Sequence, residues 1–117
     1  MSSIPASDAI RLRHMLDAAQ KALAFVDGRD RSDLESDEML ALALVRLIEI
    51  LGEAATRVSP EVQAELPGIP WRQIAGTRNR LIHGYFDVDL DIVWAIVQDD
   101  LPPCVAILDN AISQRDA

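Results

Sequence analysis

The sequence predicts an all-α fold, an antiparallel bundle of four to five helices, on three observations. Apolar residues recur at steps of three and four over most of the chain. No stretch of alternating polar and apolar residues lies between hairpin turns. The 117 residues, 50% of them hydrophobic and 26% charged, suit a single core of ordinary size. We therefore expect one helical domain over residues 1–117.

The first helix is expected to open at Ser7 or Asp8 and to end at Gly28, because glycine readily takes the left-handed conformation of a helix terminus. Its apolar stripe comprises Leu12, Met15, Ala19, Ala22 and Val26. The polar run 29–35 (RDRSDLE) offers little to a core and predicts an exposed loop.

A second helix is expected over residues 36–58, where apolar residues alternate at steps of four and three as in the seam of a bundle. The seam comprises Leu40, Leu44, Leu47, Leu51, Ala54 and Val58. Leu42 falls nearly opposite it, among Arg46, Glu49, Glu53 and Arg57. A helix that is apolar beyond one stripe usually meets a second partner, which predicts a homodimer built partly on this helix. Alternatively, other helices of the same chain could pack against these additional apolar residues.

Proline and capping residues divide the next part of the chain. Ser59 followed by proline predicts a short helix that ends at about Leu66. Pro70 suits another helix start, so a helix is expected from Trp71 to about Ile82, with Gly84 as its break.

The last helix is expected from Leu90, after a cap within residues 87–89, and it carries a further apolar stripe. Pro102 and Pro103 lack the amide hydrogen that a helix interior needs. This helix must therefore bend or restart at the two prolines.

The formal net charge of -8 speaks against binding nucleic acid, since Lys and Arg contacts to phosphate dominate such binding. The distribution of charge changes that conclusion. Between Glu65 and Asp87 the chain has three arginines, one histidine and no acid, which makes a basic segment in an acidic chain. Its cations are Arg72, Arg78, Arg80 and His83, and four of the five aromatic residues lie in or just after it.

Several kinds of site are excluded. The one cysteine, Cys104, can form neither an internal disulfide nor a zinc site. Glu49 and Glu53 share a helical face, but the Glu-x-x-His pairs of di-metal bundles are missing, and adjacent arginines suit them as ion-pair partners. A phosphate-binding glycine loop and a serine-based triad are also missing. We expect neither a metal nor another cofactor.

The segment 77–85 (TRNRLIHGY) gathers an imidazole, two guanidinium groups, an amide and a phenol within nine residues. The imidazole of His83 could take the proton of a ribose 2′-hydroxyl or return one to the leaving oxygen. The guanidinium of Arg78 could neutralise the charge on the phosphate. Without catalysis, the same residues would serve as ordinary caps at a helix C-terminus.

Geometry sets a condition on this pair. In an uninterrupted helix Arg78 and His83 lie about 140° apart around the axis, so they would not face one phosphate. Either the helix unwinds near Ile82 and Gly84, or two subunits bring their pairs together across a shared cleft.

The pattern Arg-x4-His-x-Tyr, preceded by PWRQIAGTRN and followed by FDVDLDIVW, resembles the HepT-like branch of the HEPN domain family. The upstream stretch 44–54 (LVRLIEILGEA) resembles the second helix of that family. The likeness extends over roughly residues 8–108. It implies a homodimeric helical bundle in which the motifs of both subunits line a cleft. It also implies a metal-independent endoribonuclease toxin, paired with a small nucleotidyltransferase antitoxin of the MNT type.

The resemblance also implies roles for individual residues. Arg78 and His83 match the catalytic pair, and Asn79 matches the polar residue that orients the arginine. Tyr85 matches the tyrosine to which the partner enzyme attaches AMP, a change that adds negative charge where RNA phosphate must lie. Arg80 would extend the cationic surface in support.

Two further expectations concern the setting of the protein. No apolar run reaches the roughly 18 residues of a membrane span, and the N-terminus lacks the build of a signal peptide, so we expect a cytoplasmic protein without membrane contact. The alternative function is a non-catalytic helical module, whose cleft holds a nucleotide or only the nucleotidyltransferase.

Overall fold

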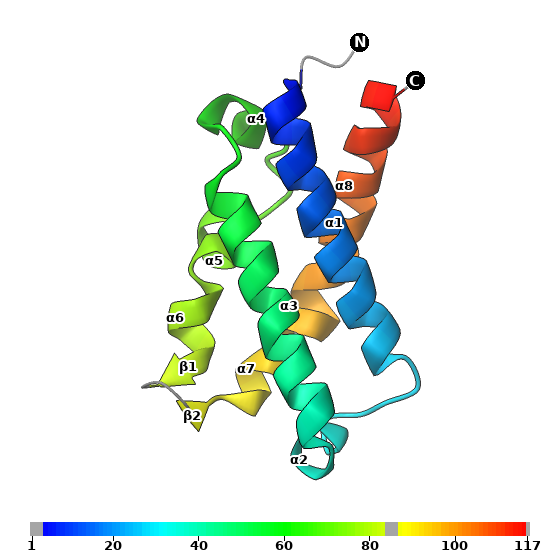
Figure 1. The fold of residues 1–117 in the computed structure, drawn as a ribbon, viewed down its shortest axis with the longest axis vertical. Coiled ribbons are helices and arrows are strands. Elements are labelled where there is room, and N and C mark those ends of the chain that lie inside the picture. The colour runs from blue at the N-terminus through cyan, green and yellow to red at the C-terminus, as the bar shows by residue number, and fades with distance from the viewer. Residues whose placement is uncertain (1–3, 84–86, 117) are drawn as a thin grey trace.

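The fold was analysed in a computed structural model, which describes residues 4–83 and 87–116, without the side chains of Arg78, Ile82 and His83. Three long helices lie side by side along the molecule: α1 (Ala6–Val26), α3 (Glu38–Thr56) and α8 (Leu101–Asp116). Helix α1 packs against both of the others and runs in the opposite direction to each (Figure 1). The all-α prediction is confirmed.

Shorter elements connect and cover these helices. They are α2 (Asp33–Ser36), α4 (Pro60–Glu65), α5 (Trp71–Ala75), α6 (Thr77–Leu81), α7 (Leu90–Ala95) and the π-helix η1 (Ile96–Asp100). Two strands of two residues each, β1 (Ile82–His83) and β2 (Asp87–Val88), form one antiparallel pair. This pairing was not predicted, because two residues are too few to establish a period of alternating polar and apolar residues.

Helix α1 begins and ends close to the predicted residues. All five residues of its predicted stripe are buried, and Gly28 has a φ of 74° just beyond its end. Asp8 in the first turn is itself buried. Its carboxylate accepts 2.8 Å hydrogen bonds from the backbone N–H and the hydroxyl of Ser59, which offset the cost of burying it. This contact ties the start of α1 to the turn between α3 and α4.

The expectation of an exposed loop over residues 29–35 is wrong in part. Residues from Asp33 form the helical turn α2, and Leu34 is only 2% exposed within the core. Arg31 donates a 2.8 Å hydrogen bond to Asp91, so the segment is also held to the start of α7. A single apolar residue among six polar ones is enough to hold this segment against the core. Its burial depends on tertiary packing and not on a repeating pattern of apolar residues.

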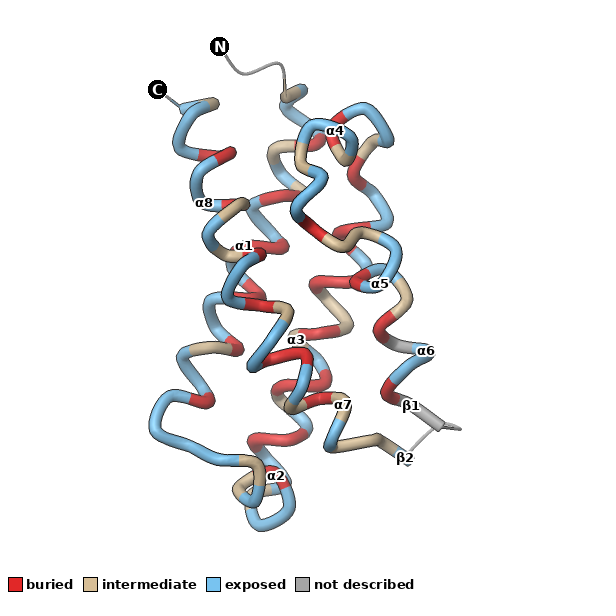
Figure 2. Tube along the Cα trace, turned by 180° about the vertical axis from the view of Figure 1, so that it is seen from behind, coloured by how far each residue is buried: buried red, intermediate tan, exposed pale blue. Residues whose placement is uncertain are grey.

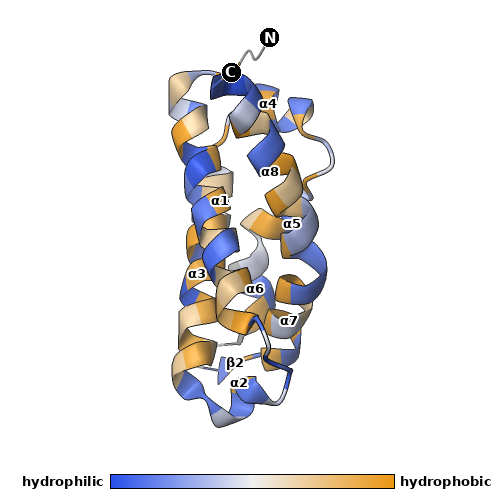
Figure 3. Ribbon diagram, turned by 90° about the vertical axis from the view of Figure 1, so that its right-hand side faces the viewer, coloured by the Kyte–Doolittle hydropathy of each residue, from blue (hydrophilic) through white to orange (hydrophobic). Residues whose placement is uncertain are grey.

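Helix α3 is confirmed, with Asp37 as its cap accepting from the backbone N–H of Leu40. Its seam is buried except for Leu47, which is half-buried. Leu42 and Met39 are 59% and 82% exposed, as the position of Leu42 opposite the seam predicts. Apolar and polar bands therefore alternate along the outside of the bundle (Figure 3).

The single helix predicted over 71–82 is wrong, because the chain forms two short helices, α5 and α6, with Gly76 between them. The hydroxyl of Thr77 bonds the carbonyl of Ile74 at 2.9 Å and occupies an acceptor at the end of α5. Side-chain bonds of this kind compete with regular helix hydrogen bonding.

Asp89 caps α7 as the sequence predicts, accepting from the backbone N–H groups of Asp91 and Ile92. The π-helix η1 then widens the helix before Pro102 and Pro103, at the second and third residues of α8. A proline ring in an α-helix clashes with the carbonyl four residues earlier, which here belongs to Gln98 and Asp99 of the wide turn. The predicted bend or restart is therefore a π-helix.

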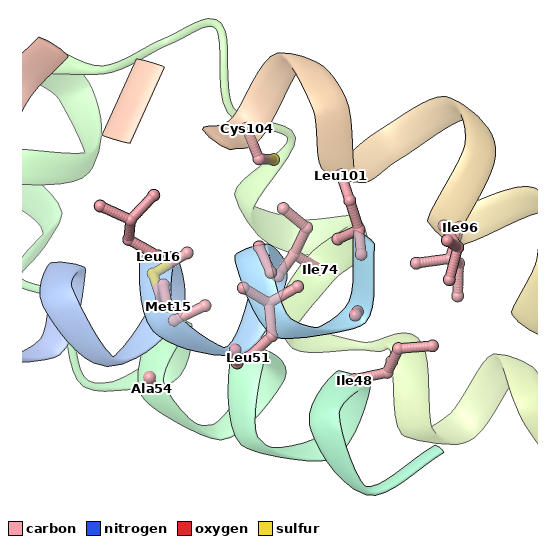
Figure 4. Packing of buried hydrophobic residues seen from close by; sticks show 14 of the residues in the cluster. Met15, Leu16, Ile48, Leu51, Ala54, Ile74, Ile96, Leu101 and Cys104 are labelled. Carbon is pink, nitrogen blue, oxygen red and sulfur yellow. The ribbon is translucent and has the colours of Figure 1, made fainter. Parts of the chain in front are cut away.

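Buried residues line the inner sides of the three long helices (Figure 2). Helices α1, α3 and α8 meet α5 and η1 in one apolar cluster (Figure 4), and the labelled members are Met15, Leu16, Ile48, Leu51, Ala54, Ile74, Ile96, Leu101 and Cys104. No helix in the described part of the chain is both long and apolar enough to cross a lipid bilayer.

Candidate active site

Helix α6, the first part of the basic motif, is fixed closely against α3. Thr77 is 1% exposed and Leu81 is fully buried, so both ends of this short helix face the core. A Cβ atom added to Gly52 of α3 would lie 2.9 Å from the carbonyl oxygen of Ile74 and 3.1 Å from Oγ1 of Thr77. Only a glycine leaves room for this approach, and the motif is thereby held against a rigid helix.

The chain leaves the helical conformation between Arg78 and His83. Helix α6 ends at Leu81, and β1 follows, with Ile82 opposite Val88 and His83 opposite Asp87. The backbone N–H of Asp89 donates a 2.7 Å hydrogen bond to the carbonyl of Leu81, which closes the segment against the start of α7. Unwinding, one of the two solutions to the geometric condition, is thus present in the backbone.

The structure places the predicted site residues only in part. It describes Asn79 and Arg80 in full, both exposed, and the backbone alone of Arg78 and His83. Tyr85 lies outside the described residues, and so does Gly84, the predicted helix break. The catalytic and modification roles therefore remain predictions.

A pocket of about 390 Å³ lies between α6 and the outward face of α3. Its lining comprises Arg46, Glu49, Gly52, Glu53, Thr56, Ala75, Thr77 and Asn79. Thr77 and Asn79, the residues before and after Arg78 in the chain, both line this pocket.

Arg80 lies on a different side of α6. Its Nη1 atom is 3.9 Å from Oδ2 of Asp100 in η1. Burial raises the pKa of Asp100 above its ordinary value of 3.8, the charge of Arg80 opposes that rise, and the charge of Asp99 adds to it. Arg80 thus links α6 to the π-helix, whereas Arg72 of α5 is exposed and forms no ion pair in the described chain.

The ion pairs that the sequence suggested for the glutamates of α3 are present in part. Glu53 does pair with Arg57, Oε1 lying 3.0 Å from Nη2. Arg46, however, forms no ion pair with a described residue, and Glu49 lines the pocket beside α6. The overlooked signal was Gly52, because a glycine inside a helix often marks a close approach of another backbone.

A family model described as Ribonuclease HepT-like matches residues 15–111, a span that contains α3, α6 and the whole motif. The chain belongs to this family. Its HepT-like relatives include two proteins named "Putative RNase". The protein from Methanocaldococcus jannaschii is 33% identical over 91 residues, covering 78% of this chain and 84% of the relative. The protein from Caldanaerobacter subterraneus subsp. tengcongensis is 35% identical over 91 residues, covering 78% and 81%.

A third relative, "Probable ribonuclease HepT" of Thermococcus cleftensis, is 39% identical over 70 residues, which cover 60% of this chain and 64% of the relative. No solved structure matches the chain. Membership in the HepT-like family confirms the resemblance that the motif and the second helix indicated, and with it the expected class of enzyme.

Proposed function

We propose that the protein is a metal-independent endoribonuclease toxin, and the match to the HepT-like ribonuclease family over residues 15–111 carries this proposal. Arg78 binds the scissile phosphate, His83 transfers protons, Asn79 orients the arginine, and Arg80 extends the cationic surface. Two features of the structure favour these roles: helix α6 ends at Leu81, before His83, and Thr77 and Asn79, the residues on either side of Arg78 in the chain, line the pocket beside α6.

The reaction that suits these groups is an internal transfer on ribose. The 2′-oxygen forms a bond to phosphorus while the bond from phosphorus to the 5′-oxygen breaks. An imidazole takes the 2′-proton, or returns a proton to the leaving oxygen, and typically contributes ~10²–10⁴-fold in rate. A guanidinium compensates the charge that gathers on the phosphate oxygens in the transition state.

The proposed active form is a homodimer whose two motifs share one cleft. The exposure of Leu42 and Met39, which lie three residues apart near the start of α3, supports a second copy at this end of the helix, because neighbouring exposed apolar side chains can form a patch for a partner. Light scattering of Leu42→Glu should then give a monomer. Ile10→Glu, a change at another exposed apolar residue on α1, should leave the dimer intact.

The proposed regulation is by a small nucleotidyltransferase of the MNT type that attaches AMP to Tyr85. An added phosphate at this position, two residues from His83, brings negative charge and bulk to the site where RNA phosphate would bind. Incubation of the two proteins with ATP should raise the mass of the parent by one AMP and should leave Tyr85→Phe unchanged.

The deciding experiment compares RNA cleavage by the purified parent and by His83→Ala, after thermal melting shows that both are folded. We expect the variant to lose ~10²-fold or more in rate. Equal cleavage by the two proteins would refute the catalytic assignment. A parent that binds the nucleotidyltransferase tightly and cleaves no RNA at any salt concentration would instead establish the alternative, a non-catalytic binding module.

A further inference from the structure

Most cations of this acidic chain are neutralised by a neighbouring carboxylate. Six arginines in the described part of the chain lie within 4 Å of an acidic oxygen, and they are Arg13, Arg29, Arg31, Arg57, Arg80 and Arg115. Arg11, Lys21, Arg46 and Arg72 form no such pair with a described residue. A cation that is not paired with a carboxylate of the protein can attract a negatively charged ligand, so the positions of these four residues are informative.

Three of the four unpaired cations, Arg11, Lys21 and Arg46, lie on one face. Arg11 and Arg46 line one hollow of about 170 Å³ between α1 and α3, together with His14 and Arg57. Lys21 lines the next hollow along the same groove, and His14 borders both. On α1, His14 is three positions after Arg11, and Lys21 is seven positions after His14. This spacing places the three side chains on one face of the helix.

This face continues into the pocket beside the motif. Arg46, Glu49 and Glu53 line both the hollow toward α1 and the pocket of about 390 Å³ toward α6. Of the two carboxylates, Glu53 is already bonded to Arg57, and Glu49 also has an interaction of its own. Arg46 therefore borders the proposed site of cleavage, and Arg11 lies farther from it, in the hollow between α3 and α1.

We propose that Arg11 and Arg46, with His14 and Lys21 beside them, bind backbone phosphates of the RNA strand that flank the scissile bond. The inference rests on the proposed ribonuclease function and adds to it a path for the strand, from the pocket at α6 across α3 to α1. Phosphate binding by arginine carries no sequence information, so the contacts strengthen binding for any sequence and leave the choice of cleavage point to other groups.

The test measures binding of a fluorescently labelled single-stranded RNA by proteins that all carry His83→Ala, over a range of salt concentrations. Arg11→Gln combined with Arg46→Gln should weaken binding for every sequence. It should also reduce the slope of log affinity against log salt by about 1.4, since each lost contact to a single strand removes about 0.7. The control combines Arg13→Gln and Arg115→Gln, which removes the same charge from arginines that are paired with Asp116.

The inference is overturned if the Arg11 and Arg46 variant binds RNA with the same affinity and slope as the control variant. It is also overturned if that variant keeps its RNA affinity but loses the complex with the nucleotidyltransferase, because the face would then serve a protein. With His83 intact, cleavage of a ribodinucleotide, which is too short to reach α1, should be equal in Arg11→Gln and the parent, because Arg11 does not line the pocket beside α6. A parent that cleaves neither substrate refutes the proposed function itself, so the two failures are distinguishable.

Discussion

Thr77 of the motif helix lies directly over Gly52 of α3, its Oγ1 atom 3.1 Å from the position that a Cβ on the glycine would occupy. The same Cβ would lie 2.9 Å from the carbonyl oxygen of Ile74, closer than real Cβ atoms are found. The motif is thus placed by the absence of a side chain on another helix.

Gly52→Ala should therefore separate α6 from α3. An alanine normally stabilises a helix interior by up to about 1 kcal/mol relative to glycine, but overpacking of this kind costs about 1–3 kcal/mol. We expect a lower free energy of unfolding in urea, and slower RNA cleavage under conditions where the variant is fully folded. Gln20→Ala, at an exposed residue of α1, serves as the control. A Gly52→Ala protein as stable and active as the parent would show that this contact does not place the motif.

Asp8→Ala should destabilise the protein by about 1–3 kcal/mol, because it leaves the backbone N–H and hydroxyl of Ser59 without their buried acceptor. Chemical denaturation measures the change, and Asp17→Ala, at an exposed position of the same helix, should be nearly neutral. A double-mutant cycle with Ser59→Ala isolates the contact. A coupling free energy near zero would show that the two residues do not stabilise each other.

Asp100→Asn should stabilise the protein at neutral pH. Burial raises the pKa of Asp100 in the folded state, so the folded protein binds this proton more tightly than the unfolded chain does. The ionised carboxylate is then destabilising above the ordinary value of 3.8, and the penalty disappears as the pH falls below it. Thermal melting should show a higher Tm for Asn at pH 7 and an advantage that shrinks as the pH falls toward about 4, where it disappears. Asp109→Asn, an exposed change on α8, should show no such trend.

Cys104 should resist alkylation in the folded protein. The thiol is 1% exposed, and burial, with a smaller contribution from the charge of Asp100, raises its pKa to about 11. Only the thiolate reacts, so iodoacetamide at pH 7.5 should leave the mass of the native protein unchanged and add one group after unfolding. Rapid labelling of the native protein would mean that α8 opens readily around this residue.

The parts of the fold that were predictable are those with a local cause. The stripes of α1 and α3 follow from a repeated period, and Ser59, Asp89 and Gly28 end or begin helices by their own chemistry. Leu34 lay beyond such reasoning because its burial depends on residues distant in the sequence. The break at Gly76 was missed for the same reason, since α5 and α6 are separated where the backbone meets Gly52 of another helix.

In the candidate site, too, only the features with a local cause could be predicted. Its residue types and family membership could be inferred from the motif, because Arg-x4-His-x-Tyr is a property of one short segment. The pocket that brings Glu49 and Arg46 beside Asn79 could not, since those residues lie thirty or more positions apart and meet only through the packing of α6 on α3. The angular separation of Arg78 and His83 predicted either an unwound helix near Ile82 and Gly84 or a cleft shared by two subunits, and helix α6 does end at Leu81.

The π-helix Ile96–Asp100 contains one residue more than an α-helical turn would need, and this sets the rotational phase of everything after it. Deleting a single residue there would turn α8 by about 100° about its own axis. Cys104 and Leu108, now facing α1 and the core, would rotate toward water, and charged neighbours would rotate inward. A one-residue shift that leaves composition nearly untouched would thus dismantle the C-terminal third of the bundle.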